Sequence, residues 1–269
     1  MRSYVLSLPP ALQPIVIVGS TVGAAFAVSL VTRTLFHTPH LELDMGLTSA
    51  VYGTLGTIYA VLIAFVVTGV WQSFSSAGTS VSSEANALTD LVFIICNLPP
   101  ERIGKSRELA KAYVTSVVER WGELVSASLC NTPVEEITLD TSFALLRSIL
   151  EIKPENDRES ALYAQALDLT ALWLDARRDR LRSAKGNTAK ALWGLLITGA
   201  FVLFAFHGMF VTHVWAVWTG LLLGFSLIVG LAFYLIFSLD SPFSGKLSAG
   251  PEPFLWLLNA LDRADEYRI

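Results

Sequence analysis

Four uninterrupted apolar runs alternate with polar stretches along the chain, at residues 15–36, 51–71, 189–211 and 214–239. A bilayer core of about 30 Å takes about 20 helical residues, so each run is long enough to cross it. Thr212 and His213 alone separate the last two runs, which predicts a tight hairpin. The pattern predicts an all-α membrane protein with four transmembrane helices in two hairpins, and a helical insert between the second and third.

The second apolar run carries a mixed stripe along one side. At about 100° of rotation per residue, six positions share about a quarter of the helix circumference: Thr54, Thr57, Val61, Phe65, Thr68 and Gln72. Polar side chains in lipid seek another helix or water as a partner. Two interpretations follow: a pore lining with a hydrophobic constriction at Val61 and Phe65, or a helix–helix seam of threonines and small residues.

The segment after the second run is predicted to be almost wholly helical. No proline occurs between this run and Pro99, so the helix is expected to continue, with Gly78 as its weak point, until Pro99 and Pro100 end it. Further helices are expected at 101–128, from Thr132, and after Pro154. Two of them show apolar stripes: Leu109, Tyr113, Val117 and Trp121, and then Leu162, Ala166, Leu169, Trp173 and Ala176.

Small polar residues extend the stripe of the second run into the insert, at Ser75, Thr79, Ser82 and Asn86. Such a face suits a water-filled vestibule, and it equally suits plain solvent exposure. Glu84 is the acid of this serine-rich stretch. It is expected either within reach of the vestibule, where it sets ion preference, or in a helix–helix hydrogen bond.

The distribution of lysine and arginine predicts the orientation in the membrane. Residues 74–188 hold 13 of the 19 basic residues, and residues 37–50 hold none. Loops rich in Lys and Arg stay in the cytoplasm. We therefore expect a membrane protein with both termini cytoplasmic, Arg33 being an exception to the rule. The expected segments are a first hairpin (1–73), a cytoplasmic helical domain (74–188), a second hairpin (189–239) and a cytoplasmic tail (240–269).

Basic residues cluster at the entrance to the third run, at Arg177, Arg178, Arg180, Arg182 and Lys185, followed by Lys190. This cluster either gathers anions or anchors the chain to acidic lipid headgroups. The net charge of −4 gives no sign of a nucleic-acid partner.

Composition and the absence of catalytic motifs narrow the function further. The chain is 53% hydrophobic and 16% charged, against about 25% charged in soluble domains. It holds no metal-binding, nucleophile or phosphate-loop motif, so no enzyme, metal or cofactor is predicted. All 23 acids lie outside the apolar runs, which argues against ion-coupled transport. Cys96 and Cys130 are expected to be reduced and structural.

Several stretches resemble the bacterial bestrophin-like membrane proteins: YAVLIAFVVTGVW, SSEANAL, LWGLLITGAF and LDSPFSGKLSAGPEPF. Bestrophins are pentameric anion channels with four membrane helices per subunit, the second of which lines a hydrophobic neck. The resemblance implies neck positions at Thr57, Val61 and Phe65, a homo-oligomer in the lipid bilayer, by analogy a pentamer, and passive conduction of small inorganic ions, anions preferred. Pro242 and Phe243 are not followed by a run of acids, so the calcium clasp of bestrophins is expected to be missing.

The alternative function is a non-conducting membrane scaffold or signalling protein that docks partners on its cytoplasmic helices. The oligomer separates the two interpretations. A ring of second spans around an axis supports a channel, whereas a monomer or a closed dimer seam supports a scaffold.

Overall fold

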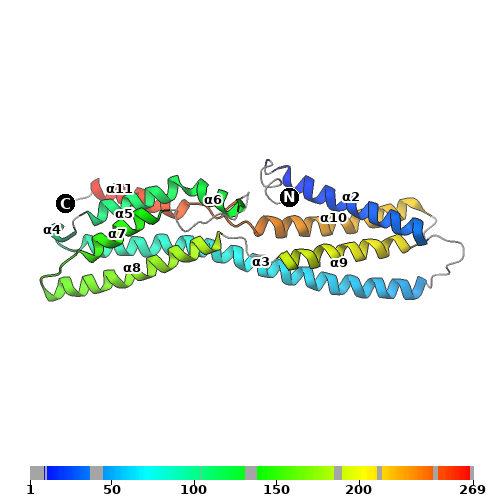
Figure 1. The fold of residues 1–269 in the computed structure, drawn as a ribbon, viewed down its shortest axis with the longest axis horizontal. Helices are drawn as coiled ribbons and strands as arrows, with labels where there is room; N and C mark the ends of the chain where they lie inside the picture. The colour runs from blue at the N-terminus through cyan, green and yellow to red at the C-terminus, as the bar shows by residue number, and fades with distance from the viewer. Residues whose placement is uncertain are drawn as a thin grey trace. The chain divides into compact units, whose positions relative to one another are not determined.

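The structure, a computed structural model, is helical and has no strand in the part of the chain that it describes, which is residues 9, 11–36, 45–103, 105–130, 138–184, 190–210, 214–244 and 248–266. The helices belong to two compact units (Figure 1). We call them the membrane unit (Met1–Gln72 and Asn187–Asp240) and the insert unit (Ser73–Gly186 and Ser241–Ile269). Helix α3 (Met45–Cys96) contributes to both.

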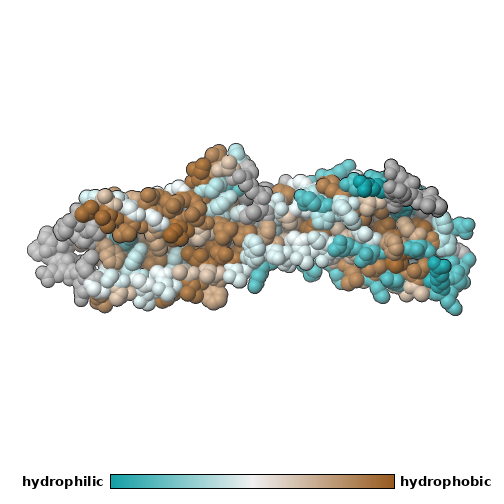
Figure 2. Space-filling view, turned by 180° about the vertical axis from the view of Figure 1, so that it is seen from behind, coloured by the Kyte–Doolittle hydropathy of each residue, from teal (hydrophilic) through white to brown (hydrophobic). Residues whose placement is uncertain are grey.

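The membrane unit contains four helices that are long and apolar enough to cross a bilayer, which confirms that part of the prediction. They are α2 (Gln13–Phe36), the first part of α3, α9 (Lys190–Met209) and α10 (Trp215–Leu239). Figure 2 shows apolar residues dominating the visible face of this unit. Helix α2 packs closely against both α9 and α10. The closest packing thus joins helices from opposite ends of the chain, and the arrangement as two hairpins stays a prediction.

Small and polar side chains make this close packing possible. A Cβ atom on Gly208 of α9 would lie 2.8 Å from Thr32 Cβ, and still closer to the Ser29 carbonyl oxygen of α2. Ser29 Oγ donates a hydrogen bond of 2.7 Å to the Phe204 carbonyl oxygen. Tyr59 of α3 likewise donates a bond of 2.8 Å to a carbonyl oxygen of α9, that of Leu196. Apolar burial gives no driving force between helices in lipid, so such contacts hold the unit together.

Helix α3 is continuous through Gly78 and ends at Cys96, just before the two prolines, as predicted. The helix expected at 101–128 is instead three pieces: α4 (Pro100–Ile103), α5 (Ser106–Glu119) and α6 (Trp121–Cys130). Arg120 is the C-cap of α5: its backbone N–H donates to the Ser116 carbonyl oxygen, and α6 begins at the next residue. Helix α7 is Leu139–Leu150, whereas the expected helix start at Thr132 lies outside the described residues.

Helix α8 (Asp157–Ser183) begins three residues after Pro154 because of a capping box. Asn156 accepts a 2.9 Å bond from the Glu159 backbone N–H, and the Glu159 carboxylate accepts from the Asn156 side chain at 2.7 Å. The first bond satisfies a backbone N–H that a helix N-terminus otherwise leaves without a partner, and the Glu159 carboxylate also accepts from the Glu155 backbone N–H at 2.8 Å. The side-chain cap thus decides where the helix starts.

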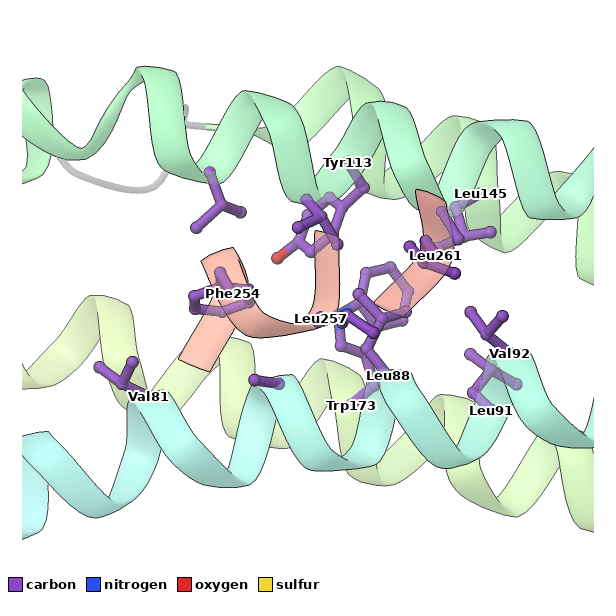
Figure 3. Packing of buried hydrophobic residues seen from close by; sticks show 14 of the residues in the cluster. Val81, Leu88, Leu91, Val92, Tyr113, Leu145, Trp173, Phe254, Leu257 and Leu261 are labelled. Atoms are coloured by element: carbon purple, nitrogen blue, oxygen red, sulfur yellow. The ribbon is translucent and has the colours of Figure 1, made fainter. Parts of the chain in front are cut away.

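The core of the insert unit lies between α3, α5, α7, α8 and α11 (Glu252–Glu266), as Figure 3 shows. The predicted stripes are confirmed: Tyr113 and Val117 are buried on α5, and Ala166 and Trp173 on α8. Helix α11 was not predicted. Its apolar residues at a spacing of three and four, Phe254, Leu257 and Leu261, are all buried in this core.

The orientation predicted from the basic residues is tested on two exposed serines, Ser49 in α3 and Ser160 in α8. Each is replaced by cysteine in a chain whose Cys96 and Cys130 are serine. We expect an impermeant maleimide to label Ser49→Cys in intact bacteria, and Ser160→Cys only after permeabilisation. The reverse pattern would show that the orientation is wrong.

The close approach of α2 and α9 predicts that Gly208→Ala destabilises the membrane unit. Its new methyl group meets a backbone carbonyl that cannot move without separating the helices, at a cost of about 1–3 kcal/mol. The control is Gly194→Ala on the same helix, where nothing lies within 4 Å of the added Cβ. That variant is expected to gain up to about 1 kcal/mol of helix propensity. Unfolding in detergent measures both, and equal effects would contradict the prediction.

Candidate functional site

The stripe of the second span lies on an exposed side of α3 in the single chain. All six residues, Thr54, Thr57, Val61, Phe65, Thr68 and Gln72, are exposed. Phe65 is 73% exposed, whereas Tyr59, Val66 and Val70 on the other side of the helix are buried. Only 11% of the apolar window of α3 is buried, the lowest share among the four membrane-length helices. The stripe is therefore free to face lipid, water or another copy of the chain.

The threonine hydroxyls of the stripe bond to their own helix. Thr54, Thr57 and Thr68 donate to the carbonyl oxygens of Ala50, Gly53 and Ala64, at 2.9, 2.9 and 2.8 Å. The hydroxyl protons therefore need no acceptor from another helix, while the lone pairs of the hydroxyl oxygens remain available on the exposed side of α3. The hydroxyls alone therefore do not decide between a pore and a seam.

The predicted vestibule residues Ser75, Thr79, Ser82 and Asn86 are also exposed, on the part of α3 in the insert unit. Thr79 and Asn86 line a groove of about 710 Å³ between α3 and α8. Ser76, Ser80 and Ser83 line the same groove, together with Asp90, Asp175 and Asp179. The face is polar and open, which both a vestibule and ordinary solvent exposure allow.

Glu84 does not share this face, so its expected place beside the vestibule is corrected. Its side chain is fully buried and accepts two hydrogen bonds from Arg180, at 2.6 Å from Nε and 3.2 Å from Nη2. The Tyr113 hydroxyl donates a third. Glu84 follows Ser75 by nine residues, which is about half a turn away at 100° per residue. The helix–helix hydrogen bond, the other sequence interpretation, is the one that the structure contains.

Aromatic rings enclose this ion pair. The Arg180 guanidinium is 1% exposed and lies 5.9 Å from the Trp121 ring and 5.6 Å from that of Phe254. The Tyr113 ring packs edge-to-face on Trp173, with centroids 4.9 Å apart. The network joins α3, α5 and α8, with α6 and α11 supplying its walls.

The environment fixes the protonation of both donors. Burial, the largest single effect, lowers the pKa of Arg180, but the charges and hydrogen bonds of Glu84 and Tyr113 together outweigh it and raise that pKa above its ordinary value. Burial, and then the charge of Glu84, raise the pKa of Tyr113. Arg180 thus stays charged and Tyr113 stays a neutral donor at physiological pH.

The basic cluster expected before the third span is not a uniform positive surface. Arg177 and Arg180 are buried, while the exposed Arg178 and Arg182 form ion pairs on their own helix. Their partners are Asp175 and Asp179. The exposed arginines are therefore matched by acids, and the two roles expected for the cluster, gathering anions or anchoring to lipid headgroups, stay predictions. Lys185 and the Lys190 side chain lie outside the description.

Arg180 and Tyr113 were not singled out from the sequence as site residues. A signal was present for Arg180, because Ala166, Trp173 and Arg180 are spaced by seven residues and so share one face of α8. An arginine that continues a buried stripe needs a carboxylate partner. The sequence offers no way to choose Glu84, which lies 96 positions away.

The cysteines and the tail motif, which the sequence also singled out, are placed as follows. Cys96 is exposed and forms no disulfide, and the Cys130 side chain lies outside the described part. Phe243, from the tail motif, is buried against Trp121 with ring centroids 5.7 Å apart. Among the described residues, no group of His, Cys, Asp and Glu is arranged to hold a metal ion.

The four helices that are long and apolar enough to cross a membrane define an all-helical membrane protein. The chain belongs to the bestrophin-like family, since the model of the Bestrophin-like domain matches residues 19–254. Its fold is similar to that of a bacterial bestrophin homologue from Klebsiella pneumoniae, known from the crystal structure of a mutant. The TM-score is 0.62 at 15% identity, covering 93% of this chain and 96% of that one. The comparison with curated proteins gives no match.

Removing one partner of the buried pair is predicted to destabilise the insert unit. Arg180→Met leaves the Glu84 charge buried, so the free energy of unfolding should fall by about 3–5 kcal/mol. Tyr113→Phe removes one donor and should cost about 1–3 kcal/mol. Denaturant unfolding of the full chain in detergent measures both. Arg182→Met, two residues from Arg180 but exposed, should change stability by less than about 1 kcal/mol; an equal loss would refute the special role of the buried pair.

Proposed function

We propose that the protein is an oligomeric channel for passive ion conduction, in which the α3 stripes of several copies line one pore. The observation that carries the proposal is the exposed stripe itself, with Phe65 at its centre and polar residues on either side. Membership of the bestrophin-like family supports it. By resemblance to bestrophins the oligomer is a pentamer, and Ser75, Thr79, Ser82 and Asn86 line its vestibule.

The chemistry of the stripe fits a gated pore. Lone pairs of Thr54, Thr57 and Thr68 and the amide of Gln72 keep water at both ends. Val61 and Phe65 offer no hydrogen bond, so a narrow ring of them excludes water and blocks ions by dewetting. Opening requires only that this ring widens.

Anion preference is proposed from the family resemblance. The stripe holds no charged residue, so selection at the neck acts through the cost of removing water from the ion. Threonine hydroxyls can donate to an anion after rotating away from their helix carbonyls. The proposed location is the bacterial inner membrane, with the insert unit and both termini in the cytoplasm.

Phe65→Ala separates a pore from a seam. If Phe65 forms the constriction, truncation widens it, and ion flux from liposomes should rise at least about threefold because dewetting is relieved. If Phe65 instead packs in a seam, the variant loses about 3 kcal/mol of contacts, and the oligomer loosens without a gain in flux. Native mass spectrometry reports the assembly, and fluorescence quenching by halides reports the flux.

Matched variants sharpen this test. Val61→Ala should behave like Phe65→Ala, whereas Val67→Ala, on another side of α3, should change flux little. Replacing potassium and then chloride in the assay measures the anion preference. An assembled Phe65→Ala oligomer with wild-type flux would refute the gate, and a wild-type protein that stays monomeric in mild detergent would favour the scaffold.

A further inference from the structure

The part of α3 in the insert unit has few bulky side chains to define which side faces the core. Of the eighteen residues 73–90, twelve are Ser, Ala, Thr or Gly. The inner side offers Ala77, Val81, Ala85 and Leu88, all buried. Ser80, beside them, is also buried, with its hydroxyl bonded to the Ala77 carbonyl oxygen. Apolar contact is non-directional, so these residues tolerate more than one rotation of α3 about its axis.

The Glu84 ion pair is directional where the surrounding contacts are not. Arg180 presents two donors in a rigid fork to the two carboxylate oxygens, and Tyr113 approaches from a third helix. Rotating α3 by one residue, about 100°, carries the carboxylate out of reach of both. Arg180, which is 1% exposed, would then remain buried without its carboxylate, a strongly unfavourable state.

A buried ion pair is a weak source of stability when compared with an apolar pair. Replacing both partners by well-packed apolar residues is often neutral or stabilising, because neither charge then has to leave water. Such pairs are explained better by specificity, as a buried asparagine specifies the register of a coiled coil. The same reasoning applies to a helix side made of small residues.

We propose that Glu84 and Arg180 are positioning residues, which set the rotational register of α3 in the insert unit and add little stability over an apolar pair. The register keeps Ser75, Thr79 and Ser82 on the exposed side and Ala85 in the core. That these exposed residues line a vestibule rests on the proposed channel function, whereas the register proposal itself does not.

The test replaces both partners, as Glu84→Met with Arg180→Met, in a full-length chain whose Cys96 and Cys130 are serine. The same chain carries Tyr113→Phe, so that the buried hydroxyl that donates to Glu84 is not left without an acceptor. We call this chain the double methionine variant. A reporter cysteine is placed at Ser82, which is exposed, or at Ala85, which is 2% exposed. Labelling by a charged methanethiosulfonate is timed in detergent, and thermal unfolding is followed in parallel. With the pair intact, the Ser82 site should react at least about a hundredfold faster than the Ala85 site, because buried sites react only on opening.

In the double methionine variant we expect the midpoint of unfolding to stay the same or rise, while the ratio of the two rates falls at least about tenfold. The matched control replaces the exposed pair Asp179 and Arg182 by methionine and should leave the ratio unchanged. An unchanged ratio in the buried double variant would overturn the proposal. A double variant that does not fold would overturn it too, since the pair would then be needed for stability.

Ion flux from liposomes separates this inference from the channel proposal. If the ratio falls but the wild-type protein carries no flux, the register stands and the channel proposal fails. If the wild type conducts and the ratio is unchanged, the channel stands and the register proposal fails. If the register and the channel proposals both stand, the double variant exposes another side of α3 to the vestibule. Its ion flux should then differ from that of the wild type by at least about threefold.

Discussion

An unbroken ladder of backbone hydrogen bonds from Met45 to Cys96 is the constraint on which the remaining structure depends. Lipid offers no water to a broken helix, so a spanning segment must satisfy its own backbone. The absence of proline between Met45 and Pro99 lets the same ladder continue into the insert unit. Each unit then builds its interior on one side of α3, on Tyr59 and Val66 in the first and on Ala85 and Leu88 in the second. The polar side stays exposed in both.

The two units hold together by different physics. In the membrane unit, Gly208 and Ser29 bring two backbones close, and hydroxyl-to-carbonyl bonds join neighbouring helices. In the insert unit, burial of Trp173, Phe254 and other large apolar side chains is the main driving force. The same water that drives burial makes an unpaired charge costly there, so Arg180 must meet Glu84. Polar contacts therefore join the helices of the membrane unit, whereas in the insert unit the buried polar contact neutralises a charge that apolar packing has removed from water.

Helix positions followed from the sequence because periodicity and prolines are local signals. Partners did not, because an apolar stripe does not say what covers it: α2 meets α9 and α10, far along the chain. The sequence left two interpretations of Glu84 open, although its angle, about half a turn from Ser75, already favoured the helix–helix hydrogen bond that the structure contains. Helix α11 was missed although Phe254, Leu257 and Leu261 have helical spacing, because the segment was expected to be only a tail. The exposed stripe of α3 was visible in the sequence, but whether it faces a pore depends on other copies of the chain.

The contact between Ser29 and Phe204 joins residues 175 positions apart. At a synthesis rate of about 5–20 residues per second, roughly 10–35 s separate the appearance of these two residues. During that interval α2 has neither of its packing partners, and its polar side chains at Thr21 and Ser29 meet lipid. Helix α2 is therefore synthesised long before the helices that cover it, and a membrane insertase that shelters it has many seconds in which to act.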